Sequence, residues 1–301
     1  MISTRLTGVA LAFATALVSG VAVYVNSKGV AHFDDATVYT TAKNAVAGLL
    51  LLALTLPLLT GVRAARARPQ ARAHWAGLVA IACVGGSVPF VLFFEGLARA
   101  SATQAAFIHK TLVIWVALLA VPLLRERLGK AHVAAIVLVV AGQAWIAGDV
   151  GTVTFGAGEA MILAATLLWA VEVIVVKRLL PALASSMLAA ARMAVGTIVL
   201  LGWVAVSGRA GGLAALGAEQ WSWAFLTGLL LAGYVATWYA ALARAQAVDV
   251  TAVLVFGAVV TAVLARATDG AAIEVSGALL ITLGAGLVAL AALGRSRLET
   301  R

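Results

Sequence analysis

The sequence predicts an all-α polytopic membrane protein with ten transmembrane helices, and three observations support this fold class. Hydrophobic residues make up 63% of the 301 residues and charged residues 11%, whereas soluble domains carry about 25% charged residues. The apolar residues form continuous runs of about 20 residues, the length that a membrane-spanning helix needs. Lys and Arg gather between alternate runs. This composition excludes a soluble enzyme, a disordered chain and a disulfide scaffold, and continuous runs disfavour a β-barrel.

Short connections separate the apolar runs and leave no room for a separate soluble domain. We expect the first run to remain as a membrane helix, because it lacks a convincing small-residue cleavage site and exceeds the core of a signal peptide. The expected helices occupy residues 6–26, 37–60, 76–98, 103–124, 131–148, 157–178, 184–206, 221–243, 250–268 and 275–294.

The distribution of Lys and Arg sets the orientation of these helices. With the N-terminus in the cytoplasm, 14 basic residues fall in cytoplasmic segments, four in outer segments and three inside helices. Cytoplasmic loops carry the excess of basic residues in membrane proteins. The count predicts that both termini are cytoplasmic, in a multi-pass protein of a bacterial-type inner membrane. It also accounts for the net charge of +9 without a nucleic-acid partner.

The two halves of the chain resemble each other. Residues 93–100 and 238–245 share two aromatic residues followed by the identities Leu, Ala, Arg and Ala. Shorter matches link 42–46 with 191–195 and 14–17 with 165–168, at offsets of 145 to 151 residues. The matches predict two five-helix units, 1–149 and 150–301. Because five is odd, the second unit is inverted, which is an architecture of secondary transporters that bind substrate near the midplane.

Three segments are typical of one transporter group. They are GLARASATQAAF at 96–107, LLRERLGKAHVAAIVLVVAGQ at 123–143, with Glu126 and Gly142, and LLWAVEVIVVKRLL at 167–180. With the ten-helix layout, they resemble the EamA-type families of the drug/metabolite transporter superfamily, including its amino-acid exporters, over nearly the whole chain. The resemblance implies export or exchange of small metabolites such as amino acids, without ATP. The fourth helix departs from the pattern, because 112–114 reads Leu-Val-Ile where a proline is common.

Three cations lie inside the expected helices, where each ionisable group costs about 2.5–3.5 kcal/mol on insertion scales. Lys43 and Arg192 are counterparts in the repeat, so they form either a carboxylate clamp or gate, or ion pairs between helices. For Arg192 the expected partner is Glu172. The counterpart of Lys110 is apolar, which favours a role in binding an anionic group of the substrate. His109 either couples protons or packs as a neutral side chain.

Two carboxylates complete the expected network. We expect Glu95 either to pair with Lys110 or to act as a protonatable group at the outer gate. Glu172 either pairs with Arg192 or carries protons. The chain has one cysteine, Cys83, and neither a phosphate-binding loop of ATPases nor the signatures of metal sites or serine hydrolases. We therefore expect no metal, no cofactor and no catalysis.

Glycine and proline indicate where the helices bend. Gly85, Gly86 and Pro89 interrupt the third helix, and Gly233 marks the corresponding region of the eighth. Such interruptions in matched helices point to a binding site, although each also fits a simple packing kink.

Aromatic residues indicate where a substrate could pack. Trp169 and Tyr234 lie deep in their helices and could contact an apolar or aromatic substrate. An interfacial aromatic belt is the simpler reading for residues nearer the helix ends, namely Phe93, Phe94, Trp238 and Tyr239.

These features predict a secondary active transporter that moves small metabolites, most simply amino acids, by alternating access. Its partners are a small-molecule substrate, protons as a candidate coupling ion, and the lipid bilayer. Alternatives are a carrier of a nucleobase, a nucleotide sugar or a drug cation, an intramembrane enzyme, and a non-transporting scaffold or channel. A site lined by Lys and Arg disfavours a cationic substrate.

Overall fold

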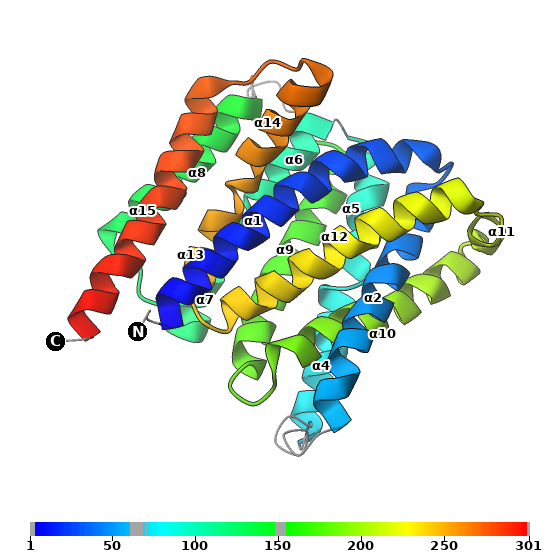
Figure 1. Ribbon diagram of the computed structural model, residues 1–301, viewed down its shortest axis with the longest axis horizontal. Coiled ribbons are helices and arrows are strands. Elements are labelled where there is room, and N and C mark those ends of the chain that lie inside the picture. The colour runs from blue at the N-terminus through cyan, green and yellow to red at the C-terminus, as the bar shows by residue number, and fades with distance from the viewer. Residues whose placement is uncertain (1–3, 61–68, 70, 101, 148–154, 300–301) are drawn as a thin grey trace.

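The computed structural model describes residues 4–60, 69, 71–100, 102–147 and 155–299. All regular secondary structure in these ranges is helical, and α1 begins at the face of the molecule where α15 ends (Figure 1). The elements are α1 (Thr4–Gly29), η1 (Val30–His32), α2 (Ala36–Thr60), α4 (Arg72–Val84), α5 (Val88–Leu97), α6 (Ala102–Lys110), α7 (Leu112–Leu124), α8 (Lys130–Ala147), α9 (Ala157–Leu179), α10 (Ser185–Val206), α11 (Ala210–Ala214), α12 (Ala218–Leu242), α13 (Ala247–Leu254), α14 (Gly257–Asp269) and α15 (Val275–Glu299).

Among the described residues, nine helical segments are long and apolar enough to cross a membrane. They correspond to nine of the expected spans. The remaining expected span, 131–148, corresponds to α8, whose apolar part Lys130–Ile146 is shorter, and residue 148 lies outside the described ranges. Leu49 and Leu54 are each 68% exposed and Val206 is 81% exposed. Exposed apolar side chains of this size fit a surface that faces lipid.

The helices of the second half run opposite to those of the first. Figure 1 shows that α1 begins at the face where its counterpart α9 ends. The packing is repeated in the same way: α1 packs on α12 as α9 packs on α5, and α1 on α14 as α9 on α7. The pairs α2 with α10 and α8 with α15 join counterparts directly. The expected boundary between the two units, at 149 and 150, lies outside the described residues.

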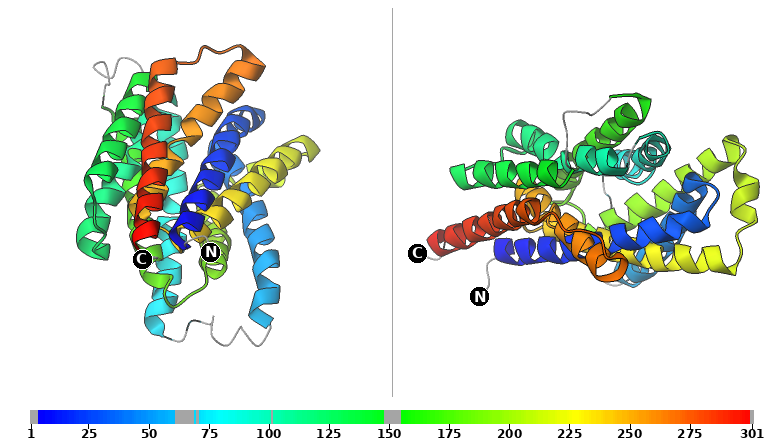
Figure 2. Two further views of the ribbon diagram at one scale, coloured as in Figure 1. Left: turned by 60° about the vertical axis from the view of Figure 1, so that its left-hand side comes forward. Right: turned by 90° about the horizontal axis from the view of Figure 1, so that it is seen from above.

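The pair α8 and α15 illustrates how the two halves come close. The two helices lie side by side at one edge of the molecule (Figure 2). A Cβ atom added to Gly142 would lie 2.6 Å from the carbonyl oxygen of Gly277, and one on Gly277 equally close to that of Gly142. Small residues allow membrane helices to approach in this way.

The expected interruption of the third span is present between α4 and α5. The Ser87 hydroxyl donates to the carbonyl oxygens of Ala82 at 2.9 Å and Cys83 at 3.3 Å, so its side chain caps the end of α4. Pro89 lies at the start of α5, where its missing N–H costs nothing. A Cβ atom on Gly86 would overlap the carbonyl oxygen of Arg192, so the break also brings α10 against the α4–α5 backbone.

The interruption expected at Gly233 is wrong. Helix α12 continues without a break from Ala218 to Leu242, and a Cβ atom on Gly233 would meet only Val18, at 3.9 Å. A lone glycine lowers helix propensity by about 1 kcal/mol but removes no backbone hydrogen bond, and no proline follows it.

Two further interruptions were not expected from the sequence. One separates α6 from α7 at Thr111, and the other separates α13 from α14 at Val255 and Phe256. With the repeat offset of 145 residues, Thr111 and Phe256 are counterparts. At both places backbone N–H groups donate to the carbonyl oxygen three residues earlier in the chain. Ile114 donates to Thr111 in this way, and Val259 donates to Phe256. Such tightened turns inside a helix often mark functional hinges.

Candidate functional site

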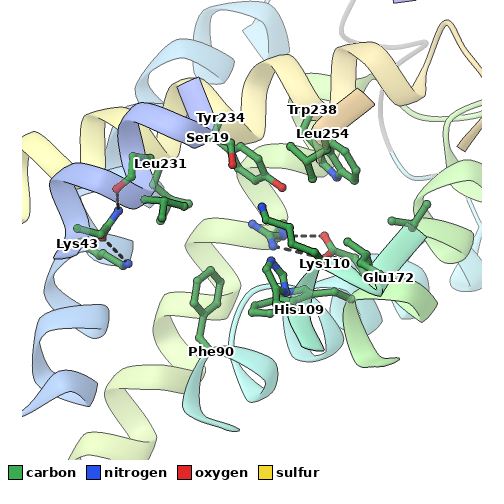
Figure 3. Close-up of a pocket in the computed structure, with 17 residues that line it drawn as sticks. Ser19, Lys43, Phe90, His109, Lys110, Glu172, Leu231, Tyr234, Trp238 and Leu254 are labelled. Atoms are coloured by element: carbon green, nitrogen blue, oxygen red, sulfur yellow. Dashed lines mark hydrogen bonds and ion pairs between the residues drawn. The ribbon is translucent and has the colours of Figure 1, made fainter. Parts of the chain in front are cut away.

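A cavity of about 170 Å³ lies between the two halves, beside the interruptions of α6–α7 and α13–α14 (Figure 3). It is similar in size to the cavity of about 150 Å³ that holds benzene in another protein, so it suits a small molecule. Seven of the expected site residues line it, namely Lys43, His109, Lys110, Trp169, Glu172, Arg192 and Tyr234.

Arg192 and Glu172 form the expected ion pair. The Arg192 Nε atom donates to Glu172 Oε1 at 2.6 Å, and Nη2 lies 3.4 Å from Oε2. The Tyr239 hydroxyl donates to the same carboxylate at 2.5 Å. Arg192 and Glu172 are 5% and 3% exposed, so each depends on the other for compensation of a buried charge. A Cβ atom on Gly85 would overlap the Glu172 carboxylate, so that glycine makes room for the pair.

Lys110 is the last residue of α6, and its side chain extends into the cavity (Figure 3). Its ammonium group makes no hydrogen bond or ion pair with any residue that the structure describes. The expected pair of Lys110 with Glu95 is therefore wrong. An ammonium group without a partner in an apolar cavity can gain a strong interaction from an anionic ligand.

Glu95 points away from the cavity and pairs with arginines instead. Its carboxylate lies 3.0 Å from Arg99 Nη1 and 2.6 Å from Arg209 Nη1. The Thr37 hydroxyl donates to it at 3.3 Å. The helix α5 directs Glu95 toward α2 and the α10–α11 connection, whereas Lys110 at the end of α6 faces the cavity.

Lys43 has neutral partners rather than the carboxylate of an ion pair. Its Nζ atom donates to Asn26 Oδ1 at 2.9 Å, and the Tyr39 hydroxyl donates to the same oxygen at 2.5 Å. The Nζ atom also lies 4.9 Å from the Tyr39 ring centre and 4.8 Å from that of Phe94. In the described residues, the helix-packing ion pair that we considered for Lys43 is absent. The two repeat counterparts therefore differ in their partners: Arg192 pairs with a carboxylate, whereas Lys43 binds a neutral amide.

His109 lies against aromatic rings at the edge of the cavity. Its ring centre is 4.9 Å from that of Trp169 and 5.4 Å from that of Phe93. The His109 Nδ1 atom is buried and has no hydrogen-bond partner among the described residues. The geometry fits a packed aromatic neighbour, and it places a ring nitrogen near Lys110.

Aromatic side chains form much of the remaining wall. The Trp169 indole N–H donates to the Gly85 carbonyl oxygen at 3.1 Å, which satisfies another backbone group at the α4–α5 break. Tyr234 and Trp238 stack with ring centres 6.0 Å apart and an angle of 12°. Trp238 is 5% exposed and Tyr239 is fully buried, so the interfacial belt expected for these two residues is wrong. The Tyr239 hydroxyl reaches Glu172 on α9, so this end of α12 faces the interior of the bundle.

The formal charge of the lining is positive. Three cations, Lys43, Lys110 and Arg192, line the cavity with one carboxylate, Glu172. Since Arg192 already pairs with Glu172, the positive charge of the two lysines faces the cavity without a carboxylate. This arrangement suits a ligand with a negative group and an apolar or aromatic body.

The sequence alone did not single out several lining residues. These residues are Asn26, Ser19 and Leu254. Asn26 had a signal, because a polar amide at the end of an apolar run needs a partner. Leu254 had none in its chemistry, but as the counterpart of His109 it could have been placed by symmetry.

Comparison with known proteins agrees with this architecture. The sequence pattern of the EamA-like transporter family matches residues 6–148 and 156–292. No curated protein matches the chain. A protein known from its crystal structure superposes with a TM-score of 0.78 and 18% sequence identity, over 98% of this chain and 99% of that one, which shows the fold alone. Since the family pattern covers both halves, the chain belongs to the EamA-like transporter family, within the drug/metabolite transporter superfamily.

Proposed function

We propose that this protein is a secondary transporter that exports or exchanges amino acids, including apolar or aromatic ones, by alternating access. Ten spanning helices, as inverted units 1–149 and 150–301, would hold it in the inner membrane with both termini cytoplasmic. Residues 63, 66, 68 and 72 and residues 125, 127 and 130 supply much of the basic excess that favours this orientation. The start of α1 and the end of α15 lie at the same face of the molecule, which agrees with this orientation.

The observation that carries this proposal is the unpartnered Lys110 ammonium group in a cavity with aromatic walls. In the proposed complex, the substrate carboxylate contacts Lys110, and Lys43 adds positive charge from the other side. The substrate side chain packs on Trp169 and Tyr234. Glu172, which lines the cavity, is better placed than Glu95 to couple protons, with His109 as a second candidate. Gly85, Gly86 and Pro89 would supply the hinge of the third span.

The size and charge of the cavity disfavour two of the alternative substrates, a nucleotide sugar and a drug cation. A nucleotide sugar is much larger than the benzene-sized ligands that suit a cavity of about 170 Å³. A drug cation would meet two lysines without a carboxylate partner. An enzyme would need a pair of catalytic groups at one place, and the structure moves Glu95 away from His109 and Lys110.

Counterflow in proteoliposomes tests the proposal. Vesicles are loaded in turn with single unlabelled amino acids, and entry of labelled tryptophan, methionine and threonine is followed. Saturable entry that internal substrate accelerates is the expected result for an exchanger. Protein-free vesicles provide the baseline. Entry without saturation would indicate a channel, and no entry into vesicles with folded protein would contradict transport of these amino acids.

A further inference from the structure

The two counterpart segments α13 and α6 are packed very differently. All eight residues of α13 are buried, whereas only Ala105 and Ile108 are buried among residues 104–110 of α6. Helix α13 packs across the interface between the halves, on α1, α7 and α8. In the described residues, α6 packs across the interface on α9, but it shows no comparable packing on α14 and α15, the counterparts of α7 and α8. The bundle is therefore closed at the face where α13 begins, and the cavity is less enclosed at the face where α6 begins.

Buried polar groups hold α13 at the closed face. Asp249 is fully buried, and its carboxylate lies 2.7 Å from Arg5 Nη2 on α1 and 3.0 Å from His132 Nε2 on α8. Arg5 also donates to the side chain of Gln246 at 3.2 Å. Three helices from different parts of the chain are thus joined through one carboxylate. Loss of one partner of such a buried pair is costly, because the other charge stays uncompensated.

A second carboxylate holds the start of α13 from the α7–α8 connection. Glu126 accepts the backbone N–H groups of Ala247 at 2.7 Å and Val248 at 3.2 Å, which a helix start leaves without partners. Burial raises the pKa of the Glu126 carboxyl, while these two hydrogen bonds act in the opposite direction. Lys177 on α9 donates to the carbonyl oxygens of Leu242 and Ala245 at the end of α12. The Glu126 contacts cross between the two halves, whereas those of Lys177 lie within the second half.

The carboxylates and the histidine of the closed face are not repeated at the other face. With the repeat offset of 145 residues, the counterparts of Asp249, Glu126 and His132 are Gln104, Ala271 and Gly277. The repeat therefore places corresponding helices at both faces. Only at the closed face do carboxylates hold the short helix, which is α13 there.

We propose that Asp249, with Arg5 and His132, and Glu126 form the latch that keeps the cytoplasmic gate shut in the outward-facing state of this transporter. The inference rests on the proposed alternating access and orientation, but its test needs no substrate. Opening toward the cytoplasm requires α13 to leave α7 and α8, so these four groups must lose their cross-interface contacts in the cycle. They are positioning residues and do not line the cavity.

Cysteine accessibility tests the latch. In a Cys83→Ser background, Ser19→Cys places one thiol in the cavity lining, and a membrane-impermeant maleimide is added to right-side-out or inside-out vesicles. While the latch is intact, this thiol should react only with maleimide that is added from the outside. Asp249→Asn, which keeps the shape and removes the charge, should raise the labelling rate from the cytoplasmic side about tenfold and lower that from outside. Asp269→Asn is the matched control, because it removes an exposed carboxylate that pairs with Lys28 at the other face.

The outcomes separate this inference from the proposed function. Unchanged labelling in folded Asp249→Asn protein, or equal labelling from both sides with the latch intact, would overturn the latch whatever the substrate is. If Asp249→Asn does not fold, Glu126→Gln gives the same readout through the second carboxylate. If amino-acid counterflow fails but Asp249→Asn shifts the labelling to the cytoplasmic side, the proposed substrate class is contradicted and the latch is supported.

Discussion

Single residues show where sequence reasoning succeeds in a membrane interior. The Arg192–Glu172 pair was predictable, because a buried arginine requires an acidic partner at similar depth in a neighbouring helix. Glu95 was assigned the wrong partner, since Arg209 is 114 residues away in sequence and comes near only through the packing of α10 with α2. The partner of Lys43 was missed because Asn26 is neutral, so a search for residues of opposite charge does not find it.

We predict that Glu172→Gln destabilises the protein by about 3–5 kcal/mol, because it leaves the Arg192 guanidinium buried without a counter-charge. The measurement is thermal unfolding of the purified protein in detergent. Replacing both residues, with Glu172→Leu and Arg192→Leu, should recover a large part of the loss. A single variant as stable as the unmodified protein would show that the pair does not compensate buried charge as argued here.

At the scale of helices, glycine and proline were informative only in combination. The run Gly-Gly-Ser-Val-Pro at 85–89 predicted a break that is present, because proline cannot continue the hydrogen bonds of α4. Gly233 alone predicted a break that is absent. The interruptions at Thr111 and Phe256 contain neither glycine nor proline, so they depend on the packing of two halves that a single helix does not reveal.

We predict that Gly86→Ala destabilises the protein by about 1–3 kcal/mol, the usual cost of overpacking, since the added methyl group meets the Arg192 backbone. Gly202→Ala in α10 is the control, because a Cβ atom there has no neighbour within 4 Å. Folded yield and thermal unfolding in detergent would be compared. Equal tolerance of both substitutions would contradict the close approach of α10 to the break.

The whole molecule follows from duplication and inversion. The matches between 93–100 and 238–245 predicted the repeat, and the observed packing of counterpart helices agrees with it. The cavity could be placed between the two halves from this symmetry, and seven of the eight candidate binding and coupling residues line it. What the symmetry could not predict is the difference between the two faces, because that depends on residues such as Asp249, which the repeat does not share.

The central claim is that Lys110 binds the carboxylate of a small substrate. The most direct test measures counterflow of an amino acid identified as a substrate and of its carboxamide, by the unmodified protein, Lys110→Ala and the control Lys130→Ala. Lys130 is exposed at the start of α8, away from the cavity.

We expect the unmodified protein and Lys130→Ala to prefer the carboxylate. In Lys110→Ala, the half-saturating concentration of the carboxylate should rise about tenfold, corresponding to about 1.4 kcal/mol, and the preference should be lost. Unchanged affinity and preference in folded Lys110→Ala protein would contradict the claim.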